Sequence, residues 1–287
     1  MIKTCRILNG KDLAEKQLSE ATEKIRSMKN AGKTLTLATV QVGESADTQL
    51  YANFLKNYFG RVGIDLTTHT LPHNASEQNL ITQIGALNRD ARVTGIMVFS
   101  PLPKTIDPAN ILDNLDMRKD VEGRTFLKSH FGVFSPTSNA VLTLIEHALK
   151  ESGSGLAGKE AVVVGHSDLV GKPTAVLLMD KLATVTVCHK ETREIRSHVE
   201  KADIVVAAVG KPHVVKGDWI KPGAVVIDVG ENMVDGKLVG DVEFDRAKER
   251  AAFISPVPGG VGPLTNVMLI QNLIRLHELN EKRNGHR

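Results

Sequence analysis

The sequence predicts an α/β protein with a small N-terminal α/β domain followed by a Rossmann-type domain, which is a doubly wound parallel sheet. Three observations support this. Helix and strand patterns alternate along the chain, four short apolar runs in its second half end at or near glycine turns, and one of these runs leads through such a turn into a helix. At 287 residues the chain is long enough for two domains of about 150 residues.

The first half alternates between helical and strand patterns. Apolar residues at helical spacing predict a helix over residues 13–28, and a second helix carries Leu50, Phe54 and Phe59. Apolar runs predict strands at 35–42 and 95–99. This half is therefore expected to form a small α/β domain.

The second half reads as repeated strand and helix. A cluster of helix-breaking residues at 134–139 precedes a linking helix from about residue 141 to 150, and strands are expected at the four ranges 161–164, 183–188, 204–209 and 224–229. Parallel strands of this kind place their carboxyl ends, and the turns that follow, at the ligand-facing edge of the sheet. A last helix over about 265–279 is expected to return to the first domain.

The first of these turns has the character of a dinucleotide-binding turn. Gly165 follows a buried strand, and Gly171 opens the next helix, whose free N–H groups can face a pyrophosphate. The usual second glycine is Ser167, and Gly171 falls one residue later than in the common G-x-G-x-x-G pattern. An ordinary strand-to-helix turn of a parallel sheet is the alternative.

Composition narrows the class of partner. The chain has 36 Lys and Arg against 33 Asp and Glu, and it has no dense basic block with interleaved aromatic residues, so nucleic acid is not expected as a partner. It has no long apolar stretch and no secretory leader pattern, which predicts a cytoplasmic protein without a membrane partner. Two cysteines are too few for a disulfide framework, and the histidines lack metal-ligand spacing, so no metal is expected.

Several segments are distinctive, and together they span essentially the whole chain. They are Val42-Gly43 followed by Tyr51, Pro101-Leu-Pro103, Lys119-Asp-Val-Glu-Gly123, VVVGHSDLVGKP from Val162, TVTVCH ending at His189, ADIVVAAVGKPHVVKGDWIKPGAVVIDVGEN from Ala202, and PVPGGVGPLT from Pro256. These segments resemble the methylenetetrahydrofolate dehydrogenase/cyclohydrolase family. The last two are the most specific.

The resemblance implies a fold, a cofactor and a reaction. It implies a folate-binding catalytic domain over 1–138, an NADP-binding Rossmann domain over 139–265, and a C-terminal helix over 266–287 that packs on the first domain. It also implies that the folate lies in the cleft against the first domain and that the chain forms a homodimer, as members of the family usually do. The family oxidises methylenetetrahydrofolate to the methenyl cation and then hydrolyses that cation to formyltetrahydrofolate.

The resemblance also selects site residues. The expected cofactor-binding residues are Gly165, His166, Ser167, Val170, Gly171, Pro173, His189, Lys190, Val209, Gly210, Asp228, Gly230 and Thr265. The expected substrate-binding residues are Tyr51, Leu55, Phe99, Pro101, Glu122, Pro258, Gly259 and Gly260, of which Tyr51 and Glu122 are the catalytic candidates.

Particular chemistry suits some of these side chains. Tyr51 is expected to stack on the pterin or its aminobenzoyl ring, or else to be a core aromatic residue. Glu122 has a carboxylate for the amino edge of the pterin, with a solvated loop acid as the alternative. His166 and Lys190 follow the first two strands of the second domain, where a cation meets a 2′-phosphate; this favours NADP, although Glu191 weakens the case and plain surface charges remain an alternative.

Four departures from the family pattern fall on the substrate side. The family's lysine, four residues after the tyrosine, is Leu55, and its glutamine after the third strand is Phe99. Its Asp-Val-Asp-Gly ends here in Glu122-Gly123, and its Pro-Cys-Thr-Pro reads 136–139 as Pro-Thr-Ser-Asn. Lys56 is rotated about 100° from the lysine position on a helix, so it does not replace that lysine.

These departures are expected to affect the dehydrogenase and cyclohydrolase activities differently. Hydride transfer needs aligned carbons rather than a protein acid or base. Hydrolysis is normally helped by a titratable group worth roughly 10² to 10⁴ in rate, which Leu55 cannot supply. The sequence therefore predicts an NADP-dependent methylenetetrahydrofolate dehydrogenase with doubtful cyclohydrolase activity. A non-catalytic paralogue that binds a pterin or nucleotide, and an oxidoreductase acting on another small substrate, remain as alternatives.

Overall fold

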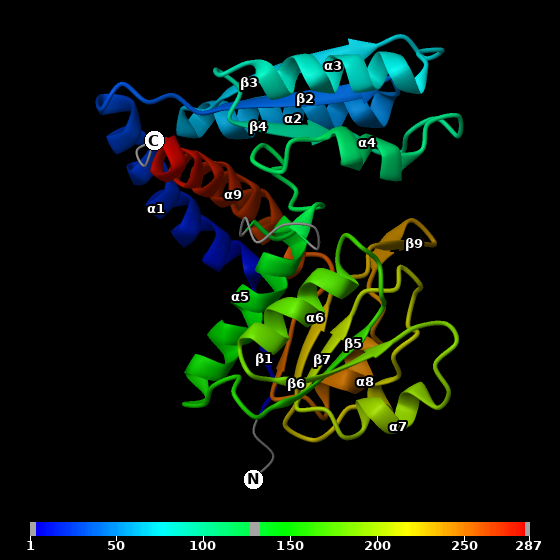
Figure 1. The fold of residues 1–287 in the computed structure, drawn as a ribbon. Coiled ribbons are helices and arrows are strands. Elements are labelled where there is room, and N and C mark those ends of the chain that lie inside the picture. The colour runs from blue at the N-terminus through cyan, green and yellow to red at the C-terminus, as the bar shows by residue number, and fades with distance from the viewer. Residues whose placement is uncertain (1–3, 127–132, 285–287) are drawn as a thin grey trace. The chain divides into compact units, whose positions relative to one another are not determined.

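The computed structural model describes residues 4–126 and 133–284 and has a mixed α/β fold (Figure 1). Within those residues the strands form a six-stranded sheet, a three-stranded sheet and a two-stranded ribbon. The chain divides into two compact units. The larger-sheet unit comprises Met1–Lys16 and Ser135–Met268, and the smaller-sheet unit comprises Gln17–Phe134 and Leu269–Arg287.

The smaller-sheet unit is built on three parallel strands in the order β3-β2-β4. Its strands are β2 (Thr36–Val42), β3 (Asp65–Leu71) and β4 (Gly95–Val98), and its helices are α2 (Ala46–Val62), α3 (Glu77–Arg89) and α4 (Pro108–Asn114), together with most of α1 (Gly10–Asn30) and α9 (Val261–Asn284). The sequence analysis did not predict β3. This edge strand carries threonines, a histidine and an aspartate, so it lacks the apolar run that identified β2.

Alternation along the strands of this unit assigns its helices to opposite faces. Leu37 of β2 and Met97 of β4 pack in one cluster with residues of α2 and α9, whereas Ala38 and Ile96 pack in another with residues of α3 and α4. Leu273 and other residues of α9 are buried in the first cluster. The prediction that the C-terminal helix packs on the first domain is confirmed.

Two helices begin earlier than predicted. Helix α5 (Pro136–Glu151) starts five residues before the expected position, because the Ser135 hydroxyl accepts a hydrogen bond from the backbone N–H of Ser138 and Pro136 occupies the first turn, where a proline costs nothing. The segment that the sequence analysis treated as a breaker is therefore a helix start. Helix α9 likewise begins at Val261 rather than near 265.

The larger-sheet unit contains a parallel sheet in the order β1-β11-β8-β7-β5-β6. Its strands are β1 (Arg6–Ile7), β5 (Glu160–Val164), β6 (Thr184–Cys188), β7 (Ile204–Ala207), β8 (Val225–Asp228) and β11 (Phe253–Ile254). Its other elements are α5, α6 (Gly171–Asp180), α7 (Ile195–Val199), the 3₁₀ turn η2 (Gly217–Trp219), α8 (Phe244–Lys248) and the antiparallel ribbon of β9 (Asn232–Val234) and β10 (Lys237–Val239). The strands β1 and β11 were not predicted, since two residues are too few to show a pattern.

This sheet is doubly wound, as predicted. Helices α5 and α6 contact β8 and β5, and Figure 1 shows them on one side of the sheet with α8 on the other. From β5 the chain passes to β6 on one side and then to β7 on the other, which makes the carboxyl ends of β5 and β7 a topological switch point. Ligands of open α/β sheets bind outside such a point.

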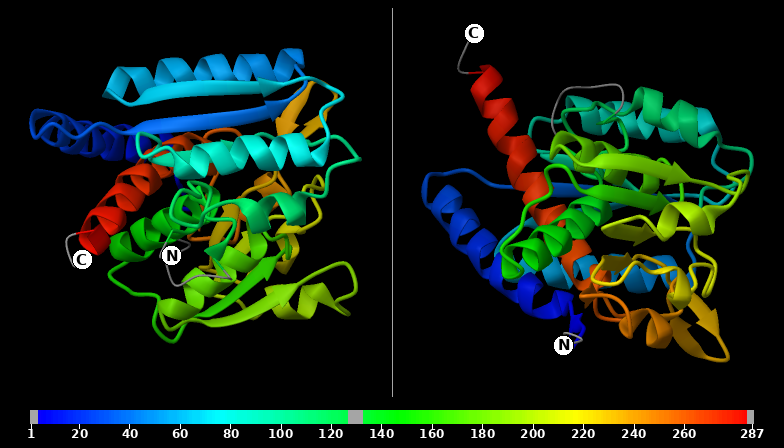
Figure 2. Two further views of the ribbon diagram at one scale, coloured as in Figure 1. Left: turned by 45° about the horizontal axis from the view of Figure 1, so that its top comes forward. Right: turned by 90° about the horizontal axis from the view of Figure 1, so that it is seen from below.

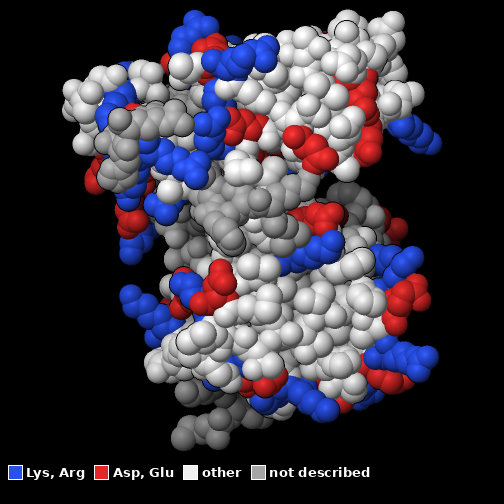
Figure 3. Space-filling view, in the orientation of Figure 1, with Lys and Arg blue, Asp and Glu red and all other residues white. Residues whose placement is uncertain are grey.

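The described residues include no helix that is long and apolar enough to cross a membrane. On the face of the molecule seen in Figure 3, basic and acidic side chains lie close to one another on each unit. In the two views of Figure 2, α9 is a single uninterrupted helix, consistent with its 24 residues.

Candidate functional site

The turn after β5 has two glycine positions at which no side chain fits. Gly165 has a φ of 126°, and a Cβ there would collide with the carbonyl group of Ala208. A Cβ on Gly171 would in turn collide with the Gly165 carbonyl. The two predicted glycines thus bring the turn after β5, the start of α6 and the end of β7 into contact.

Ser167, in the place of the usual second glycine, caps the start of α6. Its hydroxyl accepts hydrogen bonds from the backbone N–H groups of Val170 (3.2 Å) and Gly171 (3.4 Å). The carbonyl of Val170 accepts a further hydrogen bond from the hydroxyl of Ser138 (3.1 Å). Pro173 is buried in the first turn of the helix, where its missing N–H costs nothing. The turn is therefore ordered although its spacing is unusual.

Three expected cofactor-binding side chains lie at the carboxyl ends of β5 and β6. The rings of His166 and His189 are 5.3 Å apart between centroids, and both residues are exposed. The side chain of Lys190 is 83% exposed, and its Nζ lies 3.8 Å from the carboxylate of Glu191. An exposed ion pair of this kind is worth at most about 1 kcal/mol, so the ammonium of Lys190 remains available to an anion.

Asp228 is placed differently from the expectation. Its side chain is buried, and its carboxylate accepts hydrogen bonds from the backbone N–H groups of Gly230, Asp241 and Val242 at 2.8–2.9 Å. Burial raises the pKa of Asp228 to about 6, although these hydrogen bonds oppose the rise. The carboxylate therefore holds the protein's own backbone.

The exposed turn of Val209 and Gly210 after β7 depends on a residue that the sequence analysis did not identify. Asp241 is completely buried and accepts hydrogen bonds from the backbone N–H groups of both residues. Asp241 follows the β9–β10 ribbon, about 30 residues after the turn that it holds. Nothing in the sequence distinguishes it from the other acidic residues.

The glycine-rich loop after β11 lines a hollow of about 300 Å³ together with the segment 228–231. Gly259 has a φ of 108°, and the N–H of Gly260 donates to the carbonyl of Pro256 (2.9 Å). Pro258 is exposed at this loop. Thr265 lies one turn further on, where its hydroxyl donates to the carbonyl of Val261 (3.3 Å). The loop presents backbone and ring edges, which suit a flat ligand.

In the smaller-sheet unit, Tyr51 and Phe99 form an aromatic pair. Their ring centroids are 5.6 Å apart, and the ring centroid of Phe54 lies 6.4 Å from that of Tyr51. Tyr51 is 39% exposed, whereas Phe99 is 5% exposed. Pro101 follows β4 and is exposed. Tyr51 thus offers a partly exposed ring next to the buried ring of Phe99.

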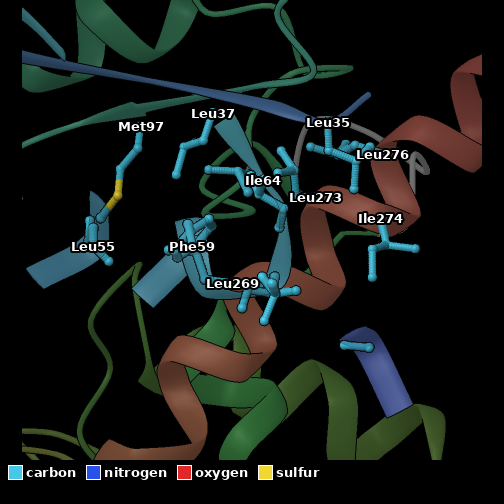
Figure 4. Packing of buried hydrophobic residues seen from close by; sticks show 14 of the residues in the cluster. Leu35, Leu37, Leu55, Phe59, Ile64, Met97, Leu269, Leu273, Ile274 and Leu276 are labelled. Carbon is cyan, nitrogen blue, oxygen red and sulfur yellow. The ribbon is translucent and has the colours of Figure 1, made fainter. Parts of the chain in front are cut away.

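Leu55 lies one helical turn after Tyr51 and is completely buried. Figure 4 shows it beside Met97, near Phe59, in the cluster that also contains Phe99. Lys56 is exposed, as the helical rotation predicts. The positions of the family's lysine and glutamine are therefore part of a continuous apolar wall.

Glu122 lies close to Tyr51 and is not a fully solvated acid. Its side chain is 16% exposed, and its carboxylate is 4.0 Å from the guanidinium of Arg124. Burial raises the pKa of Glu122 to about 7; Arg124 opposes this rise and the negative charge of Asp120 adds to it. Burial, together with the negative charge of Glu122, raises the pKa of Tyr51 to about 12.

Asp120 forms hydrogen bonds within the loop that carries Glu122. It is 1% exposed, and one of its carboxylate oxygens accepts hydrogen bonds from the backbone N–H (2.7 Å) and the hydroxyl (2.8 Å) of Thr125. Desolvation raises the pKa of Asp120.

In residues 4–126 and 133–284, no group of three or more His, Cys, Asp or Glu side chains is arranged to hold a metal ion.

Two family descriptions match this chain. Residues 8–122 match "Tetrahydrofolate dehydrogenase/cyclohydrolase, catalytic domain", and residues 135–281 match "Tetrahydrofolate dehydrogenase/cyclohydrolase, NAD(P)-binding domain". The expected nicotinamide cofactor is in keeping with the second description.

Curated relatives and solved structures match over nearly the full length. The chain is 44% identical over 271 residues to the bifunctional protein FolD 2 of Geobacter metallireducens, covering 93% of this chain and 95% of the relative. It is 43% identical to the bifunctional protein FolD of Methylobacillus flagellatus, covering 97% and 98% of the two chains.

Among solved structures, the bifunctional FolD methylenetetrahydrofolate dehydrogenase/cyclohydrolase of Campylobacter jejuni is 34% identical with a TM-score of 0.89, covering 96% of this chain and 99% of that one. The FolD of Trypanosoma brucei, solved with NADP and an inhibitor, is 34% identical with a TM-score of 0.84 and covers 96% and 97% of the two chains.

Proposed function

The chain belongs to the tetrahydrofolate dehydrogenase/cyclohydrolase family, and from this premise we propose that it oxidises methylenetetrahydrofolate with NADP in one-carbon metabolism while its cyclohydrolase activity is weak or absent. The observation that carries the second half of this proposal is the apolar wall of Leu55 and Phe99, both of them buried.

The larger-sheet unit supports dinucleotide binding. Gly165 and Gly171 leave no room for a side chain at the switch point, which is where a pyrophosphate approaches the backbone closely. Lys190 presents an exposed ammonium after the second strand, where a 2′-phosphate is recognised. When bound there, NADP supplies the acceptor for a hydride from the methylene carbon.

The smaller-sheet unit supports pterin binding. The exposed ring of Tyr51 offers a stacking surface, and the Glu122 carboxyl offers hydrogen bonds to a ring amino group. These residues orient the substrate and transfer no hydride themselves, so they meet the need of a reaction that depends on alignment.

Hydrolysis of the methenyl cation makes a different demand. Water must attack the cationic carbon while a neighbouring group takes its proton, which normally contributes roughly 10² to 10⁴ in rate. Leu55 and Phe99 have no titratable group, and they shield their surroundings from water. Replacing both members of a polar pair leaves no buried donor without an acceptor, so the apolar wall is self-consistent.

The same proposal includes a homodimer in the cytoplasm, with a tetrahydrofolate derivative as the partner and no nucleic acid or membrane. The resemblance to the family supports the dimer. The proposal keeps the domain boundaries at 1–138, 139–265 and 266–287; the two family matches end at residue 122 and begin again at residue 135, close to the first of these boundaries.

Spectroscopy of the purified protein with methylenetetrahydrofolate and NADP tests the proposal. We expect NADPH and methenyltetrahydrofolate to appear together, with methenyl product accumulating. Tight binding of NADP and folate without NADPH formation would instead favour the non-catalytic paralogue. NADP binding without folate binding would favour an oxidoreductase for another small substrate, for which the apolar wall of Leu55 and Phe99 is the specific observation.

A further inference from the structure

A buried carboxylate holds the turn that follows β7. The Asp241 side chain is completely buried just after the β9–β10 ribbon. One of its oxygens accepts hydrogen bonds from the backbone N–H groups of Val209 (2.5 Å) and Gly210 (2.9 Å). The other accepts from the N–H of Lys211 (2.9 Å) and from the side-chain amide of Asn232 (2.9 Å). Three successive backbone N–H groups therefore converge on one side chain.

Asp241 is itself held in place by Asp228. The carboxylate of Asp228 accepts hydrogen bonds from the backbone N–H groups of Asp241 (2.9 Å) and Val242 (2.8 Å). The packing is tight: a Cβ on Gly230 would collide with the Asp241 carboxylate, and a Cβ on Gly240 would collide with that of Asp228. The two carboxylates thus connect the ends of β7 and β8 to the ribbon through hydrogen bonds with little freedom to shift.

The turn that Asp241 holds lies at the switch point of the sheet. It follows β7, and the preceding residue Ala208 is packed against Gly165 of the turn after β5. Val209 and Gly210 are themselves exposed, so they are accessible to a ligand at this edge. Any displacement of residues 209–211 changes the surface on which a dinucleotide is bound.

We propose that Asp241 is a positioning residue for the dinucleotide site, because its carboxylate fixes the backbone of residues 209–211 in the form that accepts NADP. The proposal rests on the proposed function for the identity of the ligand. It assigns a role at the cofactor site to a residue that has no contact with solvent and lies some 30 residues along the chain from the turn it holds.

Only a side chain with two acceptor oxygens satisfies this arrangement. Four donors point at the Asp241 carboxylate, two at each oxygen. An asparagine has one acceptor oxygen and one NH₂ group. In either orientation its NH₂ group meets two N–H donors, so Asp241→Asn is expected to displace the turn although it keeps the size of the side chain.

The experiment compares Asp241→Asn with Asp245→Asn, a matched change at an exposed aspartate of the same unit. In the first variant, hydrogen exchange at the amides of 209–211 is expected to rise at least about 10-fold without any ligand. Its dissociation constant for NADP, measured by calorimetry, is expected to rise at least about 10-fold, with a parallel rise in the KM for NADP. The kcat at saturating NADP and the KM for the folate are expected to stay within about threefold of wild type, and Asp245→Asn to match wild type throughout.

A second variant covers the case in which Asp241→Asn does not fold. Asn232→Ala removes one donor to the Asp241 carboxylate and leaves the carboxylate in place. We expect it to raise the dissociation constant for NADP by about threefold to tenfold.

The possible outcomes separate this inference from the proposed function. If Asp241→Asn folds and keeps the wild-type rate of amide hydrogen exchange and the wild-type affinity for NADP, the inference is overturned and the proposed function is not. The same holds if the KM for the folate rises as much as the KM for NADP. If Asp241→Asn does not fold, an unchanged NADP affinity in Asn232→Ala overturns it. A wild-type protein that binds no NADP would overturn the proposed function, and the inference with it.

Discussion

Introducing a lysine and a glutamine into the apolar wall is the most informative test of the split between the two activities. We expect the double variant Leu55→Lys with Phe99→Gln to gain hydrolysis of methenyltetrahydrofolate. Leu55 lies one helical turn from Tyr51, whose ring is 5.6 Å from that of Phe99, and Leu55 and Phe99 belong to the same buried cluster. A lysine at 55 with a glutamine at 99 places a proton-handling group beside a hydrogen-bond partner.

The energetics predict that the two changes are coupled. Leu55 is completely buried, so its replacement loses about 1.5 to 3 kcal/mol of burial, and a buried ammonium adds several kcal/mol more. The total stability of a domain is only about 5 to 15 kcal/mol. A hydrogen bond from the ammonium to the glutamine carbonyl returns about 1.5 to 3 kcal/mol. The double variant should therefore be more stable than the sum of the two single changes predicts, with a coupling of about 0.5 to 3 kcal/mol.

The assay follows the loss of methenyltetrahydrofolate absorbance after the compound is supplied to each protein, and urea melts give the stability of each variant. The wild-type rate should stay near the spontaneous rate, and the double variant should exceed Leu55→Lys alone. A working base is worth roughly 10² to 10⁴ in rate, and even a poorly aligned one should be measurable. Lys56→Leu is the matched control: because Lys56 is exposed, its loss should not alter hydrolysis.

Robust hydrolysis by the unaltered protein would refute the reasoning. It would mean that another group takes the proton from water, and Glu122, whose pKa is raised to about 7, would be the first residue to replace. A fall in hydrolysis in Lys56→Leu would refute it in another way, by showing that the adjacent lysine reaches the substrate.

Three further outcomes are expected. NADP should bind more tightly than NAD, and Lys190→Ala should narrow the difference by about 1 to 3 kcal/mol in a calorimetric titration; equal wild-type affinities would remove the basis for this assignment. Burial raises the pKa of Glu122 from an ordinary 4.5 to about 7, so ionising it costs folding free energy that is absent at low pH and reaches about 3 kcal/mol above that pKa. Glu122→Gln should therefore stabilise the protein against urea at about pH 8 but little at about pH 5, whereas an equal gain at both would contradict the burial argument. Sedimentation at about micromolar concentration should show a homodimer, and a monomer would count against the family expectation.

The fold was largely predictable because its strands are of the buried, parallel type. Strands such as β5 and β7 are continuous β-branched runs, and these stand out in a sequence without any tertiary information. β3 lacked that signal because five of its seven residues are polar and they fall on both faces, and β1 is too short to carry one. The start of α5 was misplaced because a proline ends a helix in most positions but begins one when a serine caps it.

The site residues likewise divide into those that could be predicted from the sequence and those that could not. Gly165 and Gly171 were predictable, since the requirement for a missing Cβ follows from the local order of strand, turn and helix. Strand position indicated the buried side chain at 99, but positions 51 and 55 were selected by the family pattern. Helical spacing had selected Leu50, Phe54 and Phe59 as the apolar residues of this helix, and the structure buries only Phe59 of these three.

Asp228 and Asp241 differ because their partners are distant in the sequence. A carboxylate at the end of a strand is equally compatible with a ligand and with three backbone N–H groups, and only the folded chain distinguishes the two. Burial decides between them here: an ionised group 2% exposed needs hydrogen bonds to remain in the fold, and the backbone of the ribbon provides them. The acids that organise the edge of the larger sheet are therefore hidden from solvent, whereas the turn of Val209 and Gly210 and the side chains of His166, His189 and Lys190 are exposed there. The N–H groups of residues 209–211 already donate to the Asp241 carboxylate, so the proposed effect of Asp241 on a ligand acts through the conformation of this exposed turn, and a change as small as one oxygen to one nitrogen at Asp241 is expected to alter it.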